Sequence, residues 1–436
     1  MIKIKVFLLA IMLTATSVIA NAQTEGGVFN PYSQYGLGEL STLGTAASKG
    51  MGGIGVATRD RYSINMLNPA AYTMIERQNA VFSIGGEGVN NYLKTAKGSN
   101  SKNFFNLGHI GLQLRIAKRF GFGMSVAPYS DMGYELSITD KGSDVITNIG
   151  NIRFDYVGSG GIAQFKGGFA YNPFGQLNIG INYIYYLGNF KQEMSSVTTA
   201  YIDNGTIYKN IYDTRKAKIN QSSFEIGAQY VLPLKNNGKA LIFGATFQPR
   251  IASKMKKDLY LATGSSQSTA IPNDVVRDTS FNEKYYFPLK VSFGASYNTT
   301  KLHLEANYTY QDWKGSFPEN NVRGLSYNSR HEVRAGVQYT PNRFDIRSQL
   351  KRWSYRAGMT YGTSYIVKNG VKTNDYSGTI GIGIPMEREW FSMLNIAAEY
   401  GTSGVLKENQ IRNNFIKLNI GFTFAARGWF MRYKYK

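Results

Sequence analysis

From Gln78 to the C-terminus, the chain is dominated by segments in which apolar and polar residues alternate. In the segment 301–310 one face carries Leu302, Leu304, Ala306, Tyr308 and Tyr310. The opposite face carries Lys301, His303, Glu305, Asn307 and Thr309. Successive side chains of a β-strand point to opposite sides, so this pattern predicts a strand with one face in an apolar medium and the other in a polar one. Similar alternation covers 332–339, 352–361, 392–400 and 416–424.

About fourteen such segments can be placed, centred near residues 84, 111, 124, 165, 182, 227, 245, 292, 306, 335, 358, 381, 396 and 419. Most are about 10 to 15 residues long, whereas strands of soluble proteins are usually about 5 or 6 residues long. A tilted strand that crosses a membrane needs about 9 to 11 residues. The lengths therefore predict an all-β fold, a transmembrane antiparallel β-barrel of about 14 strands, over residues 78–436.

Aromatic residues recur at the ends of the predicted strands, namely Tyr183, Tyr185, Tyr285, Tyr286, Phe287, Tyr308, Tyr310, Tyr339 and Tyr400. Rings at both edges of an apolar band form the interfacial girdles of a membrane barrel. Packing in the core of a β-sandwich is the alternative interpretation. The pattern and the strand lengths together favour girdles.

The predicted connections alternate between short and long. Tight turns are expected at 235–238, 298–300 and 341–343, and longer polar loops at 191–220, 254–280, 312–328 and 364–376. Short turns on the periplasmic side and longer loops on the outer side are typical of an outer-membrane barrel.

The N-terminus predicts export. Lys3 and Lys5 precede an apolar run from Val6 to about Ala20, and small residues before Gln23 complete a signal peptide over residues 1–22. No later window holds 18 uninterrupted apolar residues, and the chain contains no cysteine. We therefore expect an integral barrel of the cell outer membrane, held by backbone pairing and packing without disulfides.

Residues 23–77 do not follow the strand pattern. The stretch 45–76 is rich in glycine and small residues and contains Gly50, Gly52, Gly53 and Gly55, which disfavour a continuous helix. A compact segment without strands, followed only by strands, predicts a plug, or hatch, inside the barrel. Met51, Ile54, Met66, Leu67 and Met74 are candidates to line an apolar pocket beside it, with plain packing against the wall as the alternative.

The formal net charge is +21, but the basic residues are scattered rather than gathered on one face. This distribution argues against nucleic acid as a partner and favours outer-membrane lipid and lipopolysaccharide. Arg334, Arg356 and Lys290 lie on predicted polar faces. They are candidates for anion binding in the lumen, with ordinary ion pairing across the lumen as the alternative.

Enzymatic motifs are absent or lack their context. Gly50–Gly55 satisfies the dinucleotide pattern G-x-G-x-x-G, but neither the preceding strand nor the following helix is predicted. His109, His303 and His331 lie on separate strands without metal-ligand spacing, and no G-x-S-x-G occurs. We predict no catalytic residue, no metal and no cofactor. Catalytic groups brought together from separate strands are the one enzymatic alternative.

The segment Lys49–Ala57, followed by Asn68-Pro69-Ala70, resembles the N-terminal hatch of the FadL/TodX family of outer-membrane transporters of hydrophobic compounds. The stretch 32–38 is similar to the start of divergent FadL-like barrels. The resemblance implies a fourteen-stranded barrel with the hatch in its lumen. It also implies passive diffusion of long-chain fatty acids or aromatic hydrocarbons through a lateral opening in the wall.

By this resemblance, the hatch and its gating depend on Gly50, Gly52, Gly53, Asn68, Pro69 and Ala70. We expect a channel or transporter for hydrophobic small molecules. The alternative is a FadL-like barrel that does not transport and serves as a scaffold or partner subunit in an outer-membrane protein complex for secretion or assembly.

Overall fold

The computed structural model describes residues 28–76, 79–95, 98–140, 142, 152–198, 209–234, 238–265, 274–318, 324–386, 392–406 and 411–426. The predicted signal peptide, residues 1–22, lies outside these ranges, as does most of the predicted turn 235–238. No helix in the described ranges is long and apolar enough to cross a membrane.

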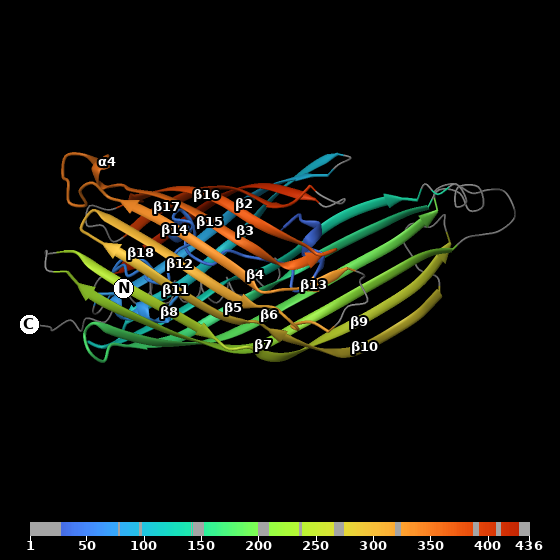
Figure 1. Ribbon diagram of the computed structural model, residues 1–436, viewed down its shortest axis with the longest axis horizontal. Coiled ribbons are helices and arrows are strands. Elements are labelled where there is room, and N and C mark those ends of the chain that lie inside the picture. The colour runs from blue at the N-terminus through green and yellow to red at the C-terminus, as the bar shows by residue number, and fades with distance from the viewer. Residues whose placement is uncertain are drawn as a thin grey trace, which may run out of the picture.

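The chain forms one closed antiparallel β-barrel with fourteen strands in its wall (Figure 1). The wall contains β2 (Ala80–Lys94), β3 (Ser99–Arg115), β4 (Phe120–Thr139), β5 (Ile152–Tyr171), β6 (Leu177–Thr198), β7 (Lys209–Pro233), β8 (Ala240–Gln248) continued by β9 (Ile251–Ser265), β10 (Asp274–Phe287) continued by β11 (Leu289–Asn298), β12 (Leu302–Asp312), β14 (Arg330–Tyr339), β15 (Ser354–Lys368), β16 (Val371–Pro385), β17 (Ser392–Gly404) and β18 (Arg412–Ala426). The shorter elements are η1 (Pro31–Gln34), β1 (Glu39–Leu40), α2 (Ala46–Lys49), η2 (Pro69–Met74), β13 (Leu325–Tyr327) and α4 (Gln349–Arg352).

The barrel closes between its last and first wall strands, where Arg412 lies opposite Lys94 and Ala426 opposite Ala80. Each of the fourteen predicted strand centres falls within a different wall strand, so this part of the prediction is confirmed. Two wall strands are interrupted where Pro249 and Pro288 occur. Proline has no N–H for the ladder, which accounts for both breaks.

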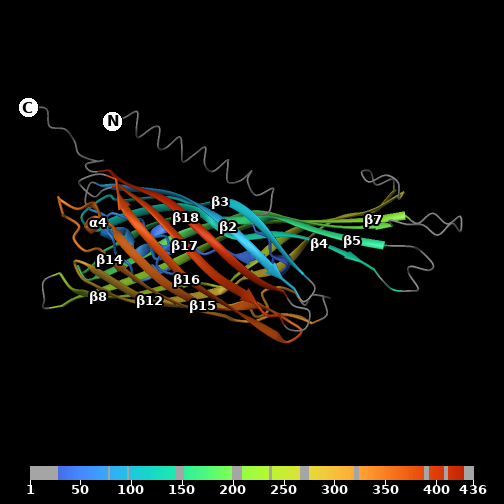
Figure 2. The same cartoon turned by 90° about the horizontal axis from the view of Figure 1, so that it is seen from above.

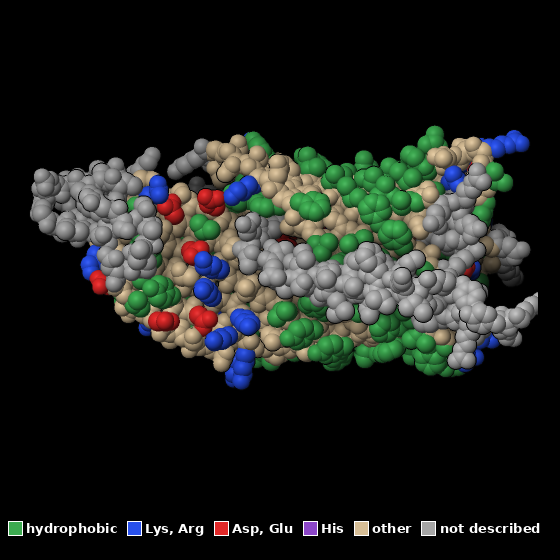
Figure 3. All heavy atoms as spheres, turned by 180° about the vertical axis from the view of Figure 1, so that it is seen from behind, with side chains coloured by type: hydrophobic (Ala, Val, Ile, Leu, Met, Phe, Trp, Pro, Cys, Tyr) green, Lys and Arg blue, Asp and Glu red, His purple; other side chains and the backbone are tan. Residues whose placement is uncertain are grey.

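The polarity of the wall is the reverse of that of a soluble protein. On β12 the apolar side chains Leu304 and Tyr308 point outward and are exposed, whereas Glu305 and Asn307 point inward and are buried. Figure 3 shows hydrophobic side chains covering one half of the barrel's length, while charged side chains dominate the other half. The apolar half is the band that faces lipid.

The barrel is taller on one side than on the other. β4, β5, β6, β7, β9 and β10 extend beyond the ends of the remaining strands (Figures 1 and 2). The predicted loops 191–220 and 254–280 were therefore wrong over much of their length, because 191–198, 209–220, 254–265 and 274–280 belong to strands. By the usual architecture of such barrels we assign this tall end to the extracellular side.

Three further local predictions need correction. The predicted loop 364–376 is a tight hairpin at Asn369 and Gly370, both with positive φ, which is the favoured chemistry of a two-residue β-turn. The predicted tight turn at 341–343 is part of a longer connection that contains α4. Tyr285 and Phe287 are not girdle residues, because both are buried in the lumen.

The reversed polarity predicts that substitution by arginine costs very different amounts of folding free energy at two exposed apolar positions. Ile380 is 67% exposed within the band, and Val276 is 60% exposed on the tall extension. Ile380→Arg should cost about 2–4 kcal/mol, because arginine is placed in hydrocarbon, and Val276→Arg should cost less than about 0.5 kcal/mol. Urea titration of refolding into lipid vesicles measures both. Equal costs would contradict the assigned position of the band.

Candidate functional site

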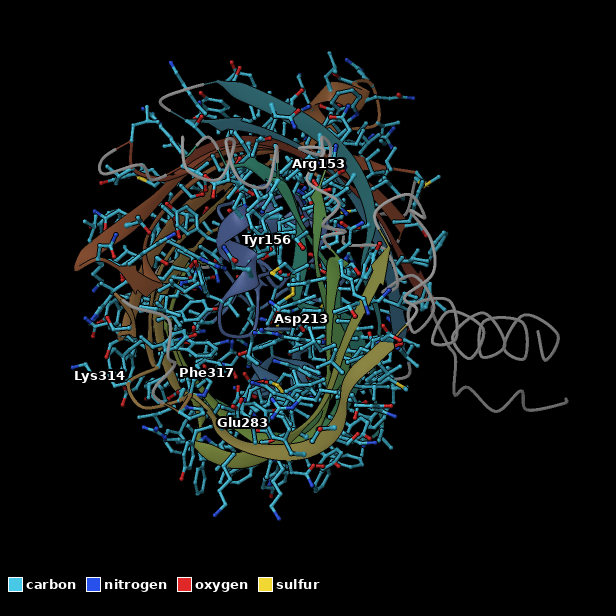
Figure 4. All side chains as sticks on the ribbon, turned by 90° about the vertical axis from the view of Figure 1, so that its right-hand side faces the viewer. Arg153, Tyr156, Asp213, Glu283, Lys314 and Phe317 are labelled. Atoms are coloured by element: carbon cyan, nitrogen blue, oxygen red, sulfur yellow. The ribbon has the colours of Figure 1, made fainter. Side chains whose placement is uncertain are left out.

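Residues 28–76, called the lumen segment below, lie inside the barrel (Figure 4). Polar side chains of the inward wall face bind its backbone. Glu305 accepts a hydrogen bond from the N–H of Ala57 (2.9 Å), and Gln229 donates to the carbonyl of Val56 (3.0 Å). Buried backbone groups outside regular structure need such partners, so the polar faces of the strands are what hold the segment in place.

The glycine-rich part of the lumen segment packs tightly against β14, β15 and β16. Gly52 and Gly53 both have φ +73°, the left-handed region in which glycine is favoured. The N–H of Gly52 donates to Thr379 Oγ1 (2.9 Å), and its carbonyl accepts from Thr360 Oγ1 (3.0 Å). Gly50 follows the short helix α2 and lies against Ala397, where a Cβ on Gly50 would be in tight contact, 3.2 Å from the Cβ of Ala397.

This glycine run therefore does not form a dinucleotide loop. The helix beside it, α2, precedes Gly50 and is four residues long, and no helix follows the glycines within the described stretch 50–68. The dinucleotide fingerprint needs a helix after the glycines, so the geometry agrees with its rejection.

Asn68, Pro69 and Ala70 form the second attachment of the lumen segment. Asn68 is fully buried and caps η2, accepting from the N–H of Ala70 (3.0 Å) through Oδ1. Its amide nitrogen donates to the carbonyls of Val56 (2.8 Å) and Ala228 (3.2 Å). Pro69 provides the first residue of η2 and lies against wall glycine Gly180. One asparagine thus joins two parts of the lumen segment to the wall.

The three predicted anion-binding cations do not meet at one site. Arg334 donates to the carbonyl of Gly53 (2.8 Å) and to Glu332 (2.9 Å), so it holds the lumen segment. Lys290 shares with it a cavity of only about 50 Å³. Arg356 donates to Gln338 (2.7 Å) and Asn395 (2.8 Å) and lines a different cavity. Anion binding by any one of them stays a prediction.

The structure also contains buried ion pairs that the sequence reading did not single out. Lys166 and Glu225 pair at 3.0 Å, with side chains only 4% and 2% exposed. Lys49, the first residue of the hatch-like stretch Lys49–Ala57, pairs with Glu87 of β2. In the sequence, the feature that could have identified Glu87 and Glu225 as lumen residues was their position on the polar face of an alternating segment. Pairing across the barrel depends on the register and could not be read from one strand.

The three histidines remain apart. His109 is bonded to Ser83 (2.9 Å), His303 lies 3.4 Å from Glu305, and the hydroxyl of Tyr308 is 2.8 Å from His331. Within the described ranges no group of three or more His, Cys, Asp or Glu side chains could hold a metal ion. The expectation of no enzymatic role stays a prediction.

A large cavity lies on the periplasmic side of the lumen segment. Its volume is about 810 Å³. All five residues expected to line an apolar pocket do line it, namely Met51, Ile54, Met66, Leu67 and Met74. Charged groups such as Arg59, Asp60 and Arg356 share the lining, so the cavity has both apolar and charged walls.

A second cavity, called the cradle below, occupies the tall extracellular end. Its volume is about 670 Å³. Apolar side chains from five wall strands line it, namely Met132, Tyr134, Tyr156, Phe190, Met194, Met255, Leu259 and Phe281. Two ion pairs, Asp213 with Arg215 and Glu283 with Lys257, lie among them. Figure 4 looks into this end and shows Tyr156, Asp213, Glu283 and Phe317 around the opening.

A cluster of buried aromatic and aliphatic side chains closes the lumen beneath the cradle. Tyr186 stacks on Phe287 with ring centroids 4.5 Å apart, and Trp313 stacks on Tyr365 at 4.4 Å. Leu37 of the lumen segment is buried in the same cluster.

The wall itself separates between β3 and β4. These strands pair only from Ile110 opposite Val126 to Arg115 opposite Gly121. Nearer the extracellular end, β4 pairs instead with β1, so that Glu39 lies opposite Asp131 and Leu40 opposite Ser130. An irregularity between Pro128 and Ser130 accompanies the separation. A bulge bends its strand and ends pairing locally, which accounts for the gap.

The lumen segment fills this gap from inside. The N–H of Asn30 donates to the carbonyl of Gly133 (2.8 Å), and that of Ser41 donates to Tyr129 (2.9 Å). Gly38 has φ +83°, and a Cβ placed there would lie 2.5 Å from the carbonyl oxygen of Asp131. Backbone groups of β4 between Tyr129 and Gly133, which are not paired with β3, are therefore bound by residues 28–41, called the gap segment below.

Comparisons with known proteins agree with this architecture. The model of the BamG family matches residues 1–436. No curated protein matches. Among solved structures, the Ralstonia pickettii toluene transporter TbuX has a TM-score of 0.58 at 14% identity, covering 88% of this chain and 98% of its own.

Two further solved structures are alike to a similar degree. The Pseudomonas putida toluene transporter TodX has a TM-score of 0.57 at 14% identity, covering 90% of this chain and 99% of its own. A Pseudomonas aeruginosa FadL homologue has a TM-score of 0.56 at 14% identity, covering 89% and 98%. At this level of identity the likeness shows the fold, that of an integral outer-membrane barrel.

The contacts of Asn68 predict how firmly the lumen segment is held. Asn68→Ala removes a helix cap, which costs about 1 kcal/mol, and removes the hydrogen bonds to the carbonyls of Val56 and Ala228, which costs about 1 kcal/mol more. Hydrogen exchange of the amides in 69–74 should therefore accelerate at least about tenfold. Asn103→Ala, at an exposed position of the wall, is the control. Unchanged exchange in the Asn68 variant would contradict the role of this residue.

Proposed function

This chain belongs to the BamG family, and we propose that it is an outer-membrane channel for hydrophobic small molecules. The observation that carries the proposal is the separation of β3 from β4, which is closed from the lumen by the gap segment. Unpaired backbone groups in lipid raise the free energy of a barrel wall. A gap that is kept in the wall and covered by a part of the chain outside the wall is therefore more readily explained by a function than by stability.

The cradle and the gap supply the two ends of a path for an apolar solute. The gap segment forms part of the cradle lining through Gln34, Tyr35 and Gly36, and it pairs with β4 at Glu39 and Leu40. A solute in the cradle therefore touches the segment that covers the gap. Displacement of this segment would let the solute pass sideways into the membrane by passive diffusion.

The substrate class we propose is that of apolar molecules such as long-chain fatty acids or monoaromatic hydrocarbons. The apolar lining of the cradle supports this class, and the structural relatives include proteins titled toluene transporters. In this proposal Gly50, Gly52, Gly53, Asn68, Pro69 and Ala70 anchor the rest of the lumen segment as a hatch while the gap segment moves.

The close approach of Gly38 to β4 provides the test. Gly38→Ala places a methyl group against the carbonyl of Asp131 and adds about 1–2 kcal/mol of left-handed strain, so it should raise the population of the state in which the gap segment is detached. Uptake of a labelled fatty acid or of toluene into proteoliposomes should rise at least about threefold. Gly175→Ala is the matched control, because Gly175 has φ +68° but open space around it.

Two results would overturn the channel proposal. One is unchanged uptake in the Gly38 variant although hydrogen exchange shows the gap segment detached. The other is equal uptake by proteoliposomes with and without the wild-type protein.

A second candidate function is that of a partner subunit in an outer-membrane protein complex. The observation that favours it is the outer edge of β10, since residues 274–285 pair with β9 on one side and with no other described strand. The family match is compatible with an assembly-related role. A free strand edge can accept an extended segment of another protein by strand addition.

Proline substitution distinguishes this second function. The N–H of Tyr286 donates away from β9, to Ser316 (2.7 Å), so alternation places the N–H of Asn282 on the free edge as well. Asn282→Pro should remove a docking hydrogen bond without disturbing the β9 ladder, whereas Asn282→Ala should change little. Native mass spectrometry after gentle extraction should show a stoichiometric protein partner that only the proline variant loses. Absence of any such partner from the wild-type protein would contradict this function.

A further inference from the structure

The lipid-facing wall over β14, β15, β16 and β17 contains a concavity of about 440 Å³. Its lining is mostly apolar and comes from outward-facing residues of these four strands, namely Val333, Ala335, Met359, Tyr361, Tyr376, Gly378 and Tyr400. We call it the wall groove. It lies on the outer surface, away from the cradle and the gap.

A missing side chain creates the wall groove. Met359 lies opposite Gly378 on one side, and Tyr400 lies opposite it on the other. Both flanking side chains stand out from the wall, at 67% and 64% exposure, whereas a Cβ placed on Gly378 would meet nothing within 4 Å. The floor of the groove is therefore the bare backbone at Gly378, which is accessible from the membrane. The long side chains of Met359 and Tyr400 form its two sides.

The extracellular edge of the wall groove is basic. Arg412 donates through Nε to the hydroxyl of Thr402 (3.0 Å), which lines the groove, and its terminal nitrogens form no hydrogen bond or ion pair with the described residues. Lys94 lies directly opposite Arg412 in the register of β2 and β18. Both side chains are exposed, and neither forms an ion pair with an acidic residue in the described part of the chain.

Lys372 adds a third cation at the same end of the wall. It lies on the outward face of β16, four residues before Tyr376 at the groove, and is exposed. It also has no acidic partner among the described ion pairs. Three cations thus stand where the strands leave the apolar band on the extracellular side.

We infer that this face binds lipopolysaccharide, a phosphorylated lipid with several acyl chains. One acyl chain would lie in the wall groove over Gly378, and a phosphate would lie against Arg412 and Lys94. Guanidinium and ammonium groups bind phosphate through charge-assisted hydrogen bonds, and an apolar hollow bounded by methionine and tyrosine accommodates a hydrocarbon chain. The basic edge and the apolar groove match the two parts of such a lipid.

The charge of the edge decides between lipopolysaccharide and the other occupants of such a hollow. A second copy of this barrel, or the wall of a partner, would bury the groove without needing a phosphate beside the cations. A zwitterionic phospholipid would fill the hollow but carries no net negative charge for two adjacent cations. This site is independent of the channel and partner functions proposed above.

Two kinds of variant test the site separately. Gly378→Phe fills the wall groove, and the double variant Lys94→Gln with Arg412→Gln removes the charge at its edge. Gly167 is the matched control for the first, because it is also on the outward face of the wall, on β5, and a Cβ there meets nothing within 4 Å. Migration on unheated gels shows that each variant is folded.

Native mass spectrometry of the delipidated barrel, titrated with purified lipopolysaccharide, measures the binding. We expect at least tenfold weaker binding for Gly378→Phe and for the double variant, and no more than a twofold change for Gly167→Phe. The loss in the double variant should shrink as salt rises. Equal binding by all variants, binding of phosphatidylethanolamine as tight as that of lipopolysaccharide, or a barrel dimer lost only in Gly378→Phe would each overturn the inference.

Discussion

Satisfaction of backbone hydrogen bonds in lipid is the constraint on which this structure depends. A bilayer offers no water to an unpaired N–H or C=O, so the strands must close on themselves. β18 pairs with β2 along its whole length and completes the closure. The wall departs from full pairing at the separation of β3 from β4 and at the outer edge of β10. The gap segment covers the first, and the second lies on the tall extension beyond the short strands.

The same constraint explains why the lumen is polar. An outward face in lipid takes most of the apolar residues, so the inward face of the wall is largely polar, and apolar packing such as that of Ile64, Met66 and Ile75 against Val81 and Ala127 is only part of what holds the lumen segment. Glu305, Gln229 and Arg334 also hold it, by hydrogen bonds to its backbone. Wall glycines such as Gly336 and Gly358 allow the backbone of the segment to approach closely at Met51. The aromatic cluster under the cradle is an exception, since it buries apolar groups inside the barrel.

What could be predicted from the sequence followed from local periodicity. Alternation on β12 identified both faces correctly, and every wall strand was placed. Tyr285 and Phe287 were misassigned because they lie on the same face of a strand in which the neighbouring Tyr286 is also aromatic. The sequence pattern at this strand end therefore does not show which face points to lipid and which to the lumen. The separation of Arg334 from Arg356 depends on the register and on the course of the lumen segment. Neither is encoded in the pattern of a single strand.

The gap segment is held more firmly than its short β1 strand suggests. Besides the bonds to β4, the hydroxyl of Tyr365 donates to the carbonyl of Gly38 (2.6 Å), and Gln192 donates to that of Gln34 (3.0 Å). At about 1 kcal/mol each, roughly half a dozen such bonds place the detached state several kcal/mol above the closed one. Spontaneous opening is then rare, and a ligand must bind the open state more tightly by a similar amount to populate it.

The cradle is where such a ligand would act. Gln34, Tyr35 and Gly36 belong both to the cradle lining and to the gap segment. An apolar solute in the cradle would therefore contact the element that must move in the proposed channel. The proposed channel thus has one physical requirement, a contact at the extracellular end that favours detachment of residues 28–41 from β4. In the proposed channel, differential binding to this segment, rather than the size of either cavity, would determine whether the wall opens.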